Sequence, residues 1–281
     1  MRDIDSSDIA RLTRRLILQA EFDIPEDVRE ALMRARSEET SAHAKFALDQ
    51  IIENQEIAAT ERTPICQDTG MIVIFAEIGQ DAHITGGNFE QAIQDGVRAA
   101  FADGYLRASV VDDPLFDRVN TRDNSPGVIH ARIVPGEGVR LLVTPKGFGS
   151  ENMSRVRMLT PSSGVDGVLD FIVDTAKLAG SNPCPPTIIG VGIGGTLEQC
   201  ALIAKRMTAR PLGKPNSDAR YAALEAECLR RINSLNIGAA GFGGSCTALA
   251  VHIDHAPTHI AGLPVAVNMC CHAARHAEGM L

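Results

Sequence analysis

The 281-residue chain contains no tryptophan, and aromatic side chains make up only 4% of it. Surfaces that bind single-stranded nucleic acid need aromatic side chains on which the bases stack, so this composition argues against such a surface. Runs of basic residues are also missing, and the net charge is −8, which disfavours non-specific binding to nucleic acid. We therefore expect no nucleic-acid partner.

Long apolar runs are absent as well. No stretch approaches the roughly 20 apolar residues that a membrane-spanning helix needs. The first residues, Met1 to Asp5, lack the apolar core of a signal peptide. The sequence therefore predicts a cytoplasmic protein with no membrane partner.

The seven cysteines show none of the usual spacings. Their number is odd, they are widely spread, and no C-x-x-C motif occurs. This pattern does not indicate a disulfide framework or a zinc ribbon in a chain of this size. A metal site would have to be assembled from cysteines that are distant in the sequence.

What is present predicts a mixed fold. Hydrophobic residues make up 44% and charged residues 22%, as in globular proteins. Residues 1 to about 60 show helical spacing, with Ser6 or Ser7 as a candidate helix N-cap. Later segments read as a buried strand (71–78), a helix (88–102) and a hairpin (128–134 with 139–143). The expected class is α/β (α+β mixed), a helical N-terminal part plus a mixed sheet with flanking helices, forming a single domain over residues 1–281.

The stretch from Arg62 to Gly70 concentrates reactive groups on one short turn. It carries the thiol of Cys66, the amide of Gln67 and the carboxyl of Asp68 immediately before the predicted strand. Loops held by rigid elements are where catalytic groups tend to lie. A helix-to-strand turn with a buried cysteine is the plainer alternative.

Two later segments have unusual backbones. Cys184 lies between prolines, which restrict the direction of its thiol. Residues 190–195 match the spacing G-x-G-x-x-G, but the second strand and acidic residue of a dinucleotide-binding unit do not follow. We therefore interpret these glycines as a tight strand-to-helix turn, and nicotinamide binding is disfavoured.

Three cysteines thus lie in special settings: Cys66, Cys184 and one of the pair Cys270 and Cys271. Cys200 and Cys228 fall inside predicted helices, as packing residues would. Three thiolates cannot complete a four-cysteine iron–sulfur site, so a [4Fe-4S] cluster held by three would leave one iron open. An open metal position suits a Lewis acid, which favours hydration or dehydration chemistry.

Five segments, in order along almost the whole chain, carry a further signal: Cys66–Gly70, Lys146–Asn152, Asn182–Pro186, Gly190–Thr196 and Thr258–Val267. Together they resemble the class I, iron–sulfur-dependent fumarate hydratases, and the resemblance is nearest to the α subunit of their two-subunit form.

The resemblance implies a [4Fe-4S] cluster with three cysteine ligands, Cys66, Cys184 and Cys271, and one open iron. It also implies reversible hydration of fumarate to (S)-malate. Asp68 and His259 would be catalytic residues that also contact the substrate, with Asp68 as a proton donor or orienting group. The other implied substrate contacts are Gln67, Arg107 and Gly149, with Arg107 pairing a substrate carboxylate.

The same resemblance implies that the active site is incomplete in this chain. A separate β subunit would supply the rest of it, including a threonine base, in an α2β2 assembly, and the substrate would be a small dicarboxylate. The α subunit of L-tartrate dehydratase resembles this family and is the nearest alternative. A non-catalytic iron–sulfur sensor or scaffold is the alternative from another class.

Overall fold

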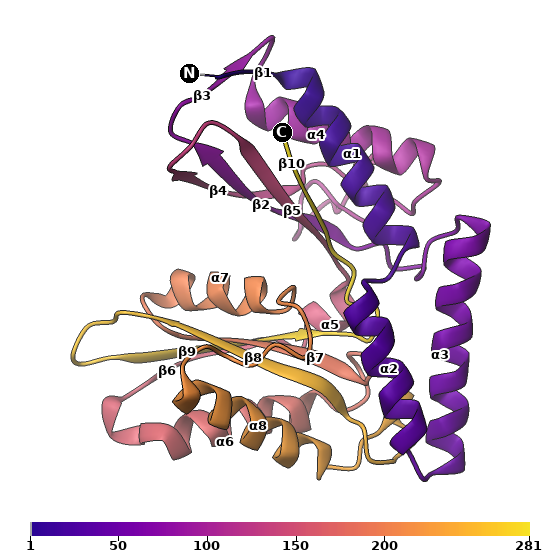
Figure 1. Ribbon diagram of the computed structural model, residues 1–281, viewed down its shortest axis with the longest axis vertical. Coiled ribbons are helices and arrows are strands. Elements are labelled where there is room, and N and C mark those ends of the chain that lie inside the picture. The colour runs from indigo at the N-terminus through magenta and orange to yellow at the C-terminus, as the bar shows by residue number, and fades with distance from the viewer. Residues whose placement is uncertain (1) are drawn as a thin grey trace. The chain divides into compact units, whose positions relative to one another are not determined.

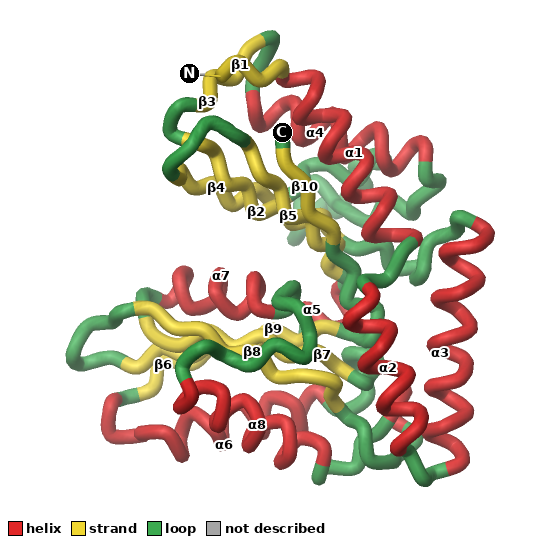
Figure 2. The backbone as a smooth tube through the Cα atoms, in the orientation of Figure 1, coloured by secondary structure: helices red, strands yellow, loops and turns green. Residues whose placement is uncertain are grey.

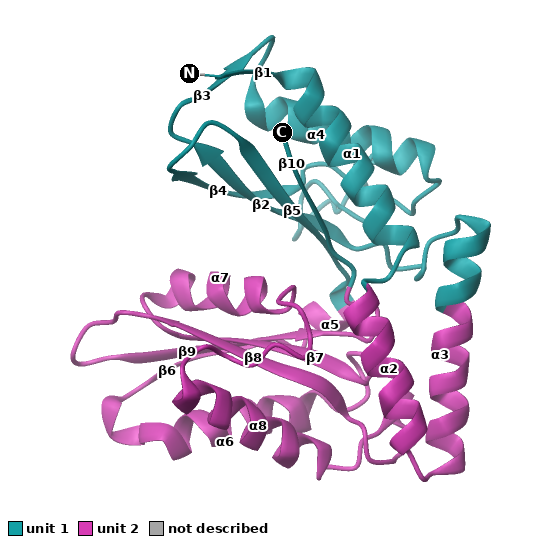
Figure 3. Cartoon of the chain, in the orientation of Figure 1, with its two compact units in different colours: residues 1–25, 55–148, 275–281 teal, residues 26–54, 149–274 magenta. Residues whose placement is uncertain are grey.

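The computed structural model describes residues 2–281. The chain forms two compact units, shown in two colours in Figure 3. Unit 1 comprises Met1–Pro25, Gln55–Phe148 and Arg275–Leu281, and unit 2 comprises Glu26–Asn54 and Gly149–Ala274. Each unit has its own sheet and its own core, and the single domain expected from the sequence stays a prediction.

Both units contain helices and strands. In unit 1 they are β1 (Arg2–Asp5), α1 (Ser6–Phe22), β2 (Met71–Gly79), β3 (Ala82–Thr85), α4 (Phe89–Asp103), β4 (Val128–Val134), β5 (Val139–Lys146) and β10 (Ala277–Met280). In unit 2 they are α2 (Glu26–Glu38), β6 (Arg155–Leu159), α6 (Gly164–Ala179), β7 (Thr187–Gly194), α7 (Leu197–Met207), α8 (Ala219–Asn233), β8 (Ala248–Ala256) and β9 (Leu263–Cys270). Two helices have residues in both units, α3 (Ala42–Glu61) and the short α5 (Phe148–Glu151).

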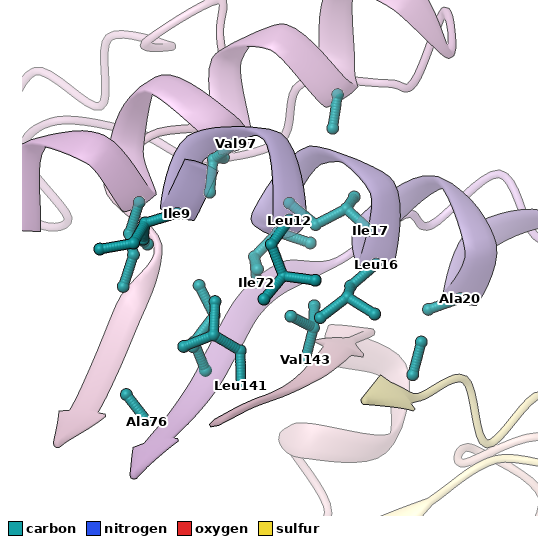
Figure 4. Close-up of a cluster of buried hydrophobic side chains, with 14 of the residues drawn as sticks. Ile9, Leu12, Leu16, Ile17, Ala20, Ile72, Ala76, Val97, Leu141 and Val143 are labelled. Atoms are coloured by element: carbon teal, nitrogen blue, oxygen red, sulfur yellow. The ribbon is translucent and has the colours of Figure 1, made fainter. Parts of the chain in front are cut away.

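Unit 1 is built on a four-stranded sheet in the order β10-β5-β2-β4. Helices α1 and α4 lie side by side over one face of this sheet (Figure 1). Ile9, Leu12 and Leu16 recur with helical spacing and point from α1 toward Ile72 and Leu141 of the sheet (Figure 4). Burying each such side chain contributes about 1.5–3 kcal/mol, so the apolar stripe of α1 fixes the helix on the sheet.

The N-terminal helices confirm the predicted helical part, with one difference at the first cap. The side chain of Asp5, rather than Ser6 or Ser7, accepts the hydrogen bond from Ser7 N at 2.8 Å. An aspartate just before a helix satisfies a free amide and also stabilises the positive end of the helix dipole. The carboxylate of Asp5, which precedes both serines, is therefore the N-cap of α1 in place of a serine hydroxyl.

The predicted hairpin between residues 128–134 and 139–143 is wrong. β4 and β5 do not pair with each other, because β2 lies between them, parallel to β4 and antiparallel to β5. The connection passes the end of β2, where Gly79 N donates to Gly138 O at 2.8 Å. A Cβ at Gly79 would lie 2.4 Å from Gly136 O, so a glycine there lets the connection cross so closely. Alternating hydrophobicity located both strands but did not reveal that β2 lies between them.

Unit 2 is also a sheet covered by helices. Its strand order is β6-β9-β7-β8, with β7 parallel to β8 and antiparallel to β9. Figures 1 and 2 show α7 on one face of this sheet and α6 with α8 on the other. The two four-stranded sheets both mix parallel and antiparallel pairs, which confirms the predicted mixed class.

The glycines of the G-x-G-x-x-G spacing have a packing role. Gly190 and Gly192 lie inside β7, and a Cβ on either would come within 2.0 Å of a backbone oxygen of α7, Ala204 O or Cys200 O. Only Gly194 and Gly195 form the turn, with φ of +83° and +69°. The spacing therefore reflects a helix packed directly on a strand backbone, as well as the expected strand-to-helix turn.

Substitution Gly192→Ala is expected to destabilise the protein strongly. The new methyl group would overlap Cys200 O, so α7 must move away from β7, at a cost of about 3 kcal/mol or more. Chemical denaturation measures the effect. Gly262→Ala is the control, since its Cβ would lie 3.8 Å from the nearest atom, His259 O. Equal stability of the two variants would contradict this account of the β7 glycines.

Among residues 2–281, no helix combines the length and the apolar character needed to cross a membrane.

Candidate functional site

The turn from Arg62 to Gly70 joins α3 to β2 in unit 1. Ile65 N donates to Glu21 O at 2.9 Å, which ties the turn to α1. Cys66 is half-buried, and its Sγ accepts from Asp68 N at 3.4 Å. At the end of the turn Gly70 has φ +71°, and a Cβ there would lie 2.5 Å from the backbone of Lys146. A glycine is required at this position because the backbone is left-handed and lies against another strand.

The carboxyl of Asp68 is held on both oxygens by backbone amides. Oδ1 accepts from Gly70 N at 3.1 Å and Oδ2 accepts from Phe148 N at 2.8 Å. These bonds fix the orientation of the carboxyl, while the side chain of the preceding Gln67 is exposed. Two polar groups of the predicted site therefore lie on one rigid turn.

A buried ion pair lies against the turn from Arg62 to Gly70. Arg275 Nη2 donates to Asp68 O at 2.7 Å, and Arg275 Nη1 donates to Glu21 Oε2 at 2.6 Å. Both side chains are almost fully buried. The pKa of Glu21 is raised from 4.5 to about 7, because the raising effect of burial exceeds the lowering effect of the neighbouring Arg275. The C-terminal segment, α1 and the turn are thereby linked through one guanidinium.

Arg107 lies on an irregular segment that is fastened to the same turn. Its side chain is exposed, and its backbone oxygen accepts from Thr69 Oγ1 at 2.7 Å. Thr69 is itself buried and immediately follows Asp68. Unit 1 therefore brings four predicted site residues, Cys66, Gln67, Asp68 and Arg107, onto two backbone segments that a hydrogen bond joins.

Cys184 lies in unit 2, in the turn that follows α6. It is exposed and has φ +52°, a conformation that is uncommon for a non-glycine residue. Its N donates to Ser181 O at 3.1 Å, and its O accepts from His272 N at 3.3 Å. Residues held in such conformations by surrounding bonds cluster at functional sites. The second bond also places the Cys184 turn against the segment that carries Cys271.

Cys271 follows the last residue of β9 and is half-buried, whereas Cys270 is the buried end of that strand. Gly149 also belongs to this region, since a Cβ on it would lie 3.6 Å from Asn182 O. Unit 2 thus brings together Gly149, Cys184 and Cys271.

A polar network holds the Gly149 turn to β9. Asn268 Nδ2 donates to Glu151 Oε2 at 3.0 Å and to Ser154 Oγ at 3.2 Å. Ser154 Oγ also accepts from Met269 N at 3.0 Å. Glu151 pairs with Lys205 of α7 as well. The backbone leading to Cys271 is therefore fixed by side chains that follow Gly149.

His259 is not brought to the cysteines of unit 2. It lies in the turn between β8 and β9, where its Nδ1 accepts from Ala261 N at 3.2 Å. Cys271 follows the opposite end of β9, and eight strand residues span about 26 Å. The substrate contact predicted for His259 stays a prediction, and within this unit the strand separates it from Cys184 and Cys271.

The remaining cysteines are poor thiolate donors. Cys200 and Cys228 are fully buried in α7 and α8, and burial raises the pKa of Cys228 to about 12. Burial also raises the pKa of Cys246 to about 12. Among residues 2–281, no three His, Cys, Asp or Glu side chains gather to hold a single metal ion.

Three supporting residues escaped the sequence analysis: Glu21, Arg275 and Asn124, whose side chain hydrogen-bonds Gly70 O and the backbone amides of residues 109 and 110. A signal existed for Glu21, since it lies four residues after Ile17 on the apolar stripe of α1, where a charge needs a buried partner. Asn124 lies in a long polar loop that sequence patterns leave without structure. Arg275 offered no signal, because its contacts are made with residues 207 and 254 positions away in the chain.

The comparison with protein families decides the broad identity. The family model described as fumarate hydratase (fumerase) matches residues 10–280. The chain belongs to this fumarate hydratase family. The family resemblance predicted from the sequence is thereby confirmed, and the family activity is that of a hydro-lyase.

Individual members of the family give a second view. A Methanocaldococcus jannaschii protein provisionally named L(+)-tartrate dehydratase subunit alpha is 39% identical over 273 residues, which cover 96% of each chain. The L(+)-tartrate dehydratase subunit alpha of Escherichia coli K12 is 30% identical over 262 residues, covering 92% of this chain and 85% of that one. This member of the fumarate hydratase family is therefore similar over most of its length to chains named as alpha subunits.

Proposed function

We propose that this chain is the α subunit of an iron–sulfur hydro-lyase that adds water to, or removes it from, a four-carbon dicarboxylate. Family membership supports the hydro-lyase activity, and the alpha-subunit names of its relatives support a β partner. The α2β2 assembly and the threonine base of the partner rest on the family resemblance. The single family domain over residues 1–281 belongs to the same proposal.

The proposed cofactor is a [4Fe-4S] cluster held by Cys66, Cys184 and Cys271. The donor set fits, because none of these thiols is in a disulfide and each lies in a turn whose backbone is fixed by hydrogen bonds. The four other cysteines are buried or have a thiol whose pKa is raised by burial. When bound, such a cluster supplies an iron with an open position that acts as a Lewis acid toward a substrate oxygen.

The chain itself contributes binding and orientation. The exposed guanidinium of Arg107 can form two parallel hydrogen bonds with a substrate carboxylate. Asp68, whose carboxyl accepts hydrogen bonds from Gly70 N and Phe148 N, would orient a substrate hydroxyl or exchange a proton with it. Gln67 and the backbone of Gly149 are further contacts in this proposal. His259 is kept as a substrate contact only on the family resemblance.

Two substrates are candidates, and a different observation supports each of them. The segments Lys146–Asn152 and Gly243–Ala250 look more like those of the fumarate hydratases and favour fumarate, giving (S)-malate. The names of the relatives favour L(+)-tartrate, whose loss of water gives oxaloacetate. L(+)-tartrate carries one hydroxyl more than malate, the hydrated form of fumarate, and a site built to hydrogen-bond that hydroxyl discriminates strongly against a substrate that lacks it.

The test is the co-expressed α and β subunits, with the cluster reconstituted anaerobically. We expect kcat/KM for the true substrate to exceed that for the other by about 100-fold or more. Fumarate consumption and oxaloacetate formation are followed separately by ultraviolet absorbance. A reconstituted assembly that holds iron and sulfide but converts neither compound would contradict the proposed function and favour a sensor or scaffold.

A further inference from the structure

Asn124 connects the Arg107 segment to the turn that carries Cys66 and Asp68. Its side chain is fully buried, and its backbone has φ +58°. Oδ1 accepts from Ser109 N at 2.7 Å and from Val110 N at 3.1 Å. Nδ2 donates to Gly70 O at 2.9 Å. One side chain thus bonds two separate backbone segments, both of which carry predicted site residues.

The orientation of this amide is fixed by its partners. Two of them are N–H donors and the third is a carbonyl, so exchanging the amide oxygen and nitrogen would face donors with donors. The segment 106–110 forms no helix or strand, and Asn124 supplies hydrogen bonds that a neighbouring strand would otherwise give. Thr69 Oγ1 adds a parallel link to Arg107 O. Arg107 is therefore held to the Asp68 turn by two independent side-chain bridges.

We infer that Asn124 is a positioning residue for substrate binding, because it fixes the backbone from which the Arg107 guanidinium reaches a substrate carboxylate. The inference rests on the proposed function, in which Arg107 and Asp68 contact the same dicarboxylate. Asn124 touches no reacting atom. Its effect is on the spacing between the carboxylate-binding guanidinium and the polar groups of the turn, and spacing of this kind governs binding and orientation.

The decisive variant is Asn124→Asp. A carboxylate still accepts from Ser109 N and Val110 N, but it faces Gly70 O with an acceptor in place of a donor. In the assembled, reconstituted enzyme we expect KM to rise about tenfold while kcat stays within about threefold. The dissociation constant of succinate, a four-carbon dicarboxylate that cannot be hydrated, should rise by the same factor. Iron per chain should remain at the wild-type value.

Asp113→Ala is the matched control. Asp113 lies in the same loop and also accepts two backbone N–H bonds, from Leu115 N at 2.7 Å and Phe116 N at 2.6 Å, but these bonds lie in an exposed turn away from Arg107. We expect its KM and succinate affinity to match the wild type. Equal effects of Asn124→Asp and Asp113→Ala would overturn the inference, since they would indicate a general loss of loop order.

A second pair of variants covers the case in which Asn124→Asp does not fold. Thr69→Val removes the hydroxyl that bonds Arg107 O and should weaken succinate binding in the same direction, while Thr69→Ser keeps the hydroxyl and should restore it. Unchanged succinate binding in Thr69→Val and in any folded Asn124→Asp protein overturns the inference. Failure of the wild-type assembly to convert either substrate is a separate result, which contradicts the proposed function instead.

Discussion

Anaerobic reconstitution of Cys184→Ser or Cys271→Ser is expected to yield a protein that keeps less than about one of the roughly four iron atoms bound by the wild type. A serine hydroxyl is a hard, weakly acidic ligand and does not replace a thiolate on iron. Cys184 is exposed in a turn that hydrogen-bonds the segment of Cys271. Loss of either thiol would leave only one of these two neighbouring cysteines to bind iron. Iron and acid-labile sulfide per chain measure the effect, and Cys66→Ser should behave alike.

Cys270→Ser is the matched control, because it changes the neighbouring residue by the same single atom. Cys270 ends β9, where it is buried and paired with Ile188, and it should be dispensable for iron binding. Retention of the cluster in Cys271→Ser together with its loss in Cys270→Ser would show that the wrong member of the pair was assigned. Full retention in all four variants would remove the proposed cofactor site altogether.

The parts of the fold that local patterns determine were predictable. Helical spacing of apolar residues located α1 and α4, and the apolar run after Gly70 located β2. Strand neighbours were not predictable, as the failed hairpin shows. β2 separates β4 from β5 although it precedes both in sequence, and hydrophobic alternation carries no information on which strands pair.

The residues of the candidate site also divide into those that the sequence predicts and those that it does not. Residues with distinctive chemistry in constrained turns, Cys66 and Cys184, stood out in the sequence. Asn124 did not, because its role depends on three backbone atoms supplied by residues 14, 15 and 54 positions away. Residues that position others act through tertiary contacts, so the sequence reveals candidate ligands more readily than the groups that would hold them.

Substitution Arg275→Met is expected to lower the free energy of unfolding by about 3–5 kcal/mol. The change removes the guanidinium but leaves the fully buried carboxyl of Glu21 without its partner at 2.6 Å. It also leaves the backbone oxygen of Asp68 without the donor at 2.7 Å. Chemical denaturation under anaerobic conditions measures the loss.

The double variant Glu21→Leu/Arg275→Met separates these contributions. Removing both charges eliminates the unpaired buried carboxyl, so the double variant should be more stable than Arg275→Met by about 2 kcal/mol. The Asp68 oxygen stays unpaired in both proteins and cancels in the comparison. A double variant less stable than Arg275→Met would mean that the pair itself, and not the unpaired buried carboxyl, accounts for the effect.

The same carboxyl should make the stability of the protein depend on pH. Burial raises the pKa of Glu21 from 4.5 to about 7, against the lowering effect of Arg275, so the folded state binds its proton more tightly than the unfolded state. Stability from this group is then complete below pH 4.5 and is lost as pH rises through 7, by up to about 3 kcal/mol. In Glu21→Gln the side chain cannot ionise, so the difference in unfolding free energy between wild type and variant should change over this range and level off above it. Parallel stability curves between pH 4.5 and 8 would instead mean that Arg275 keeps Glu21 ionised, with the pair acting as a permanent salt bridge beneath the Asp68 turn.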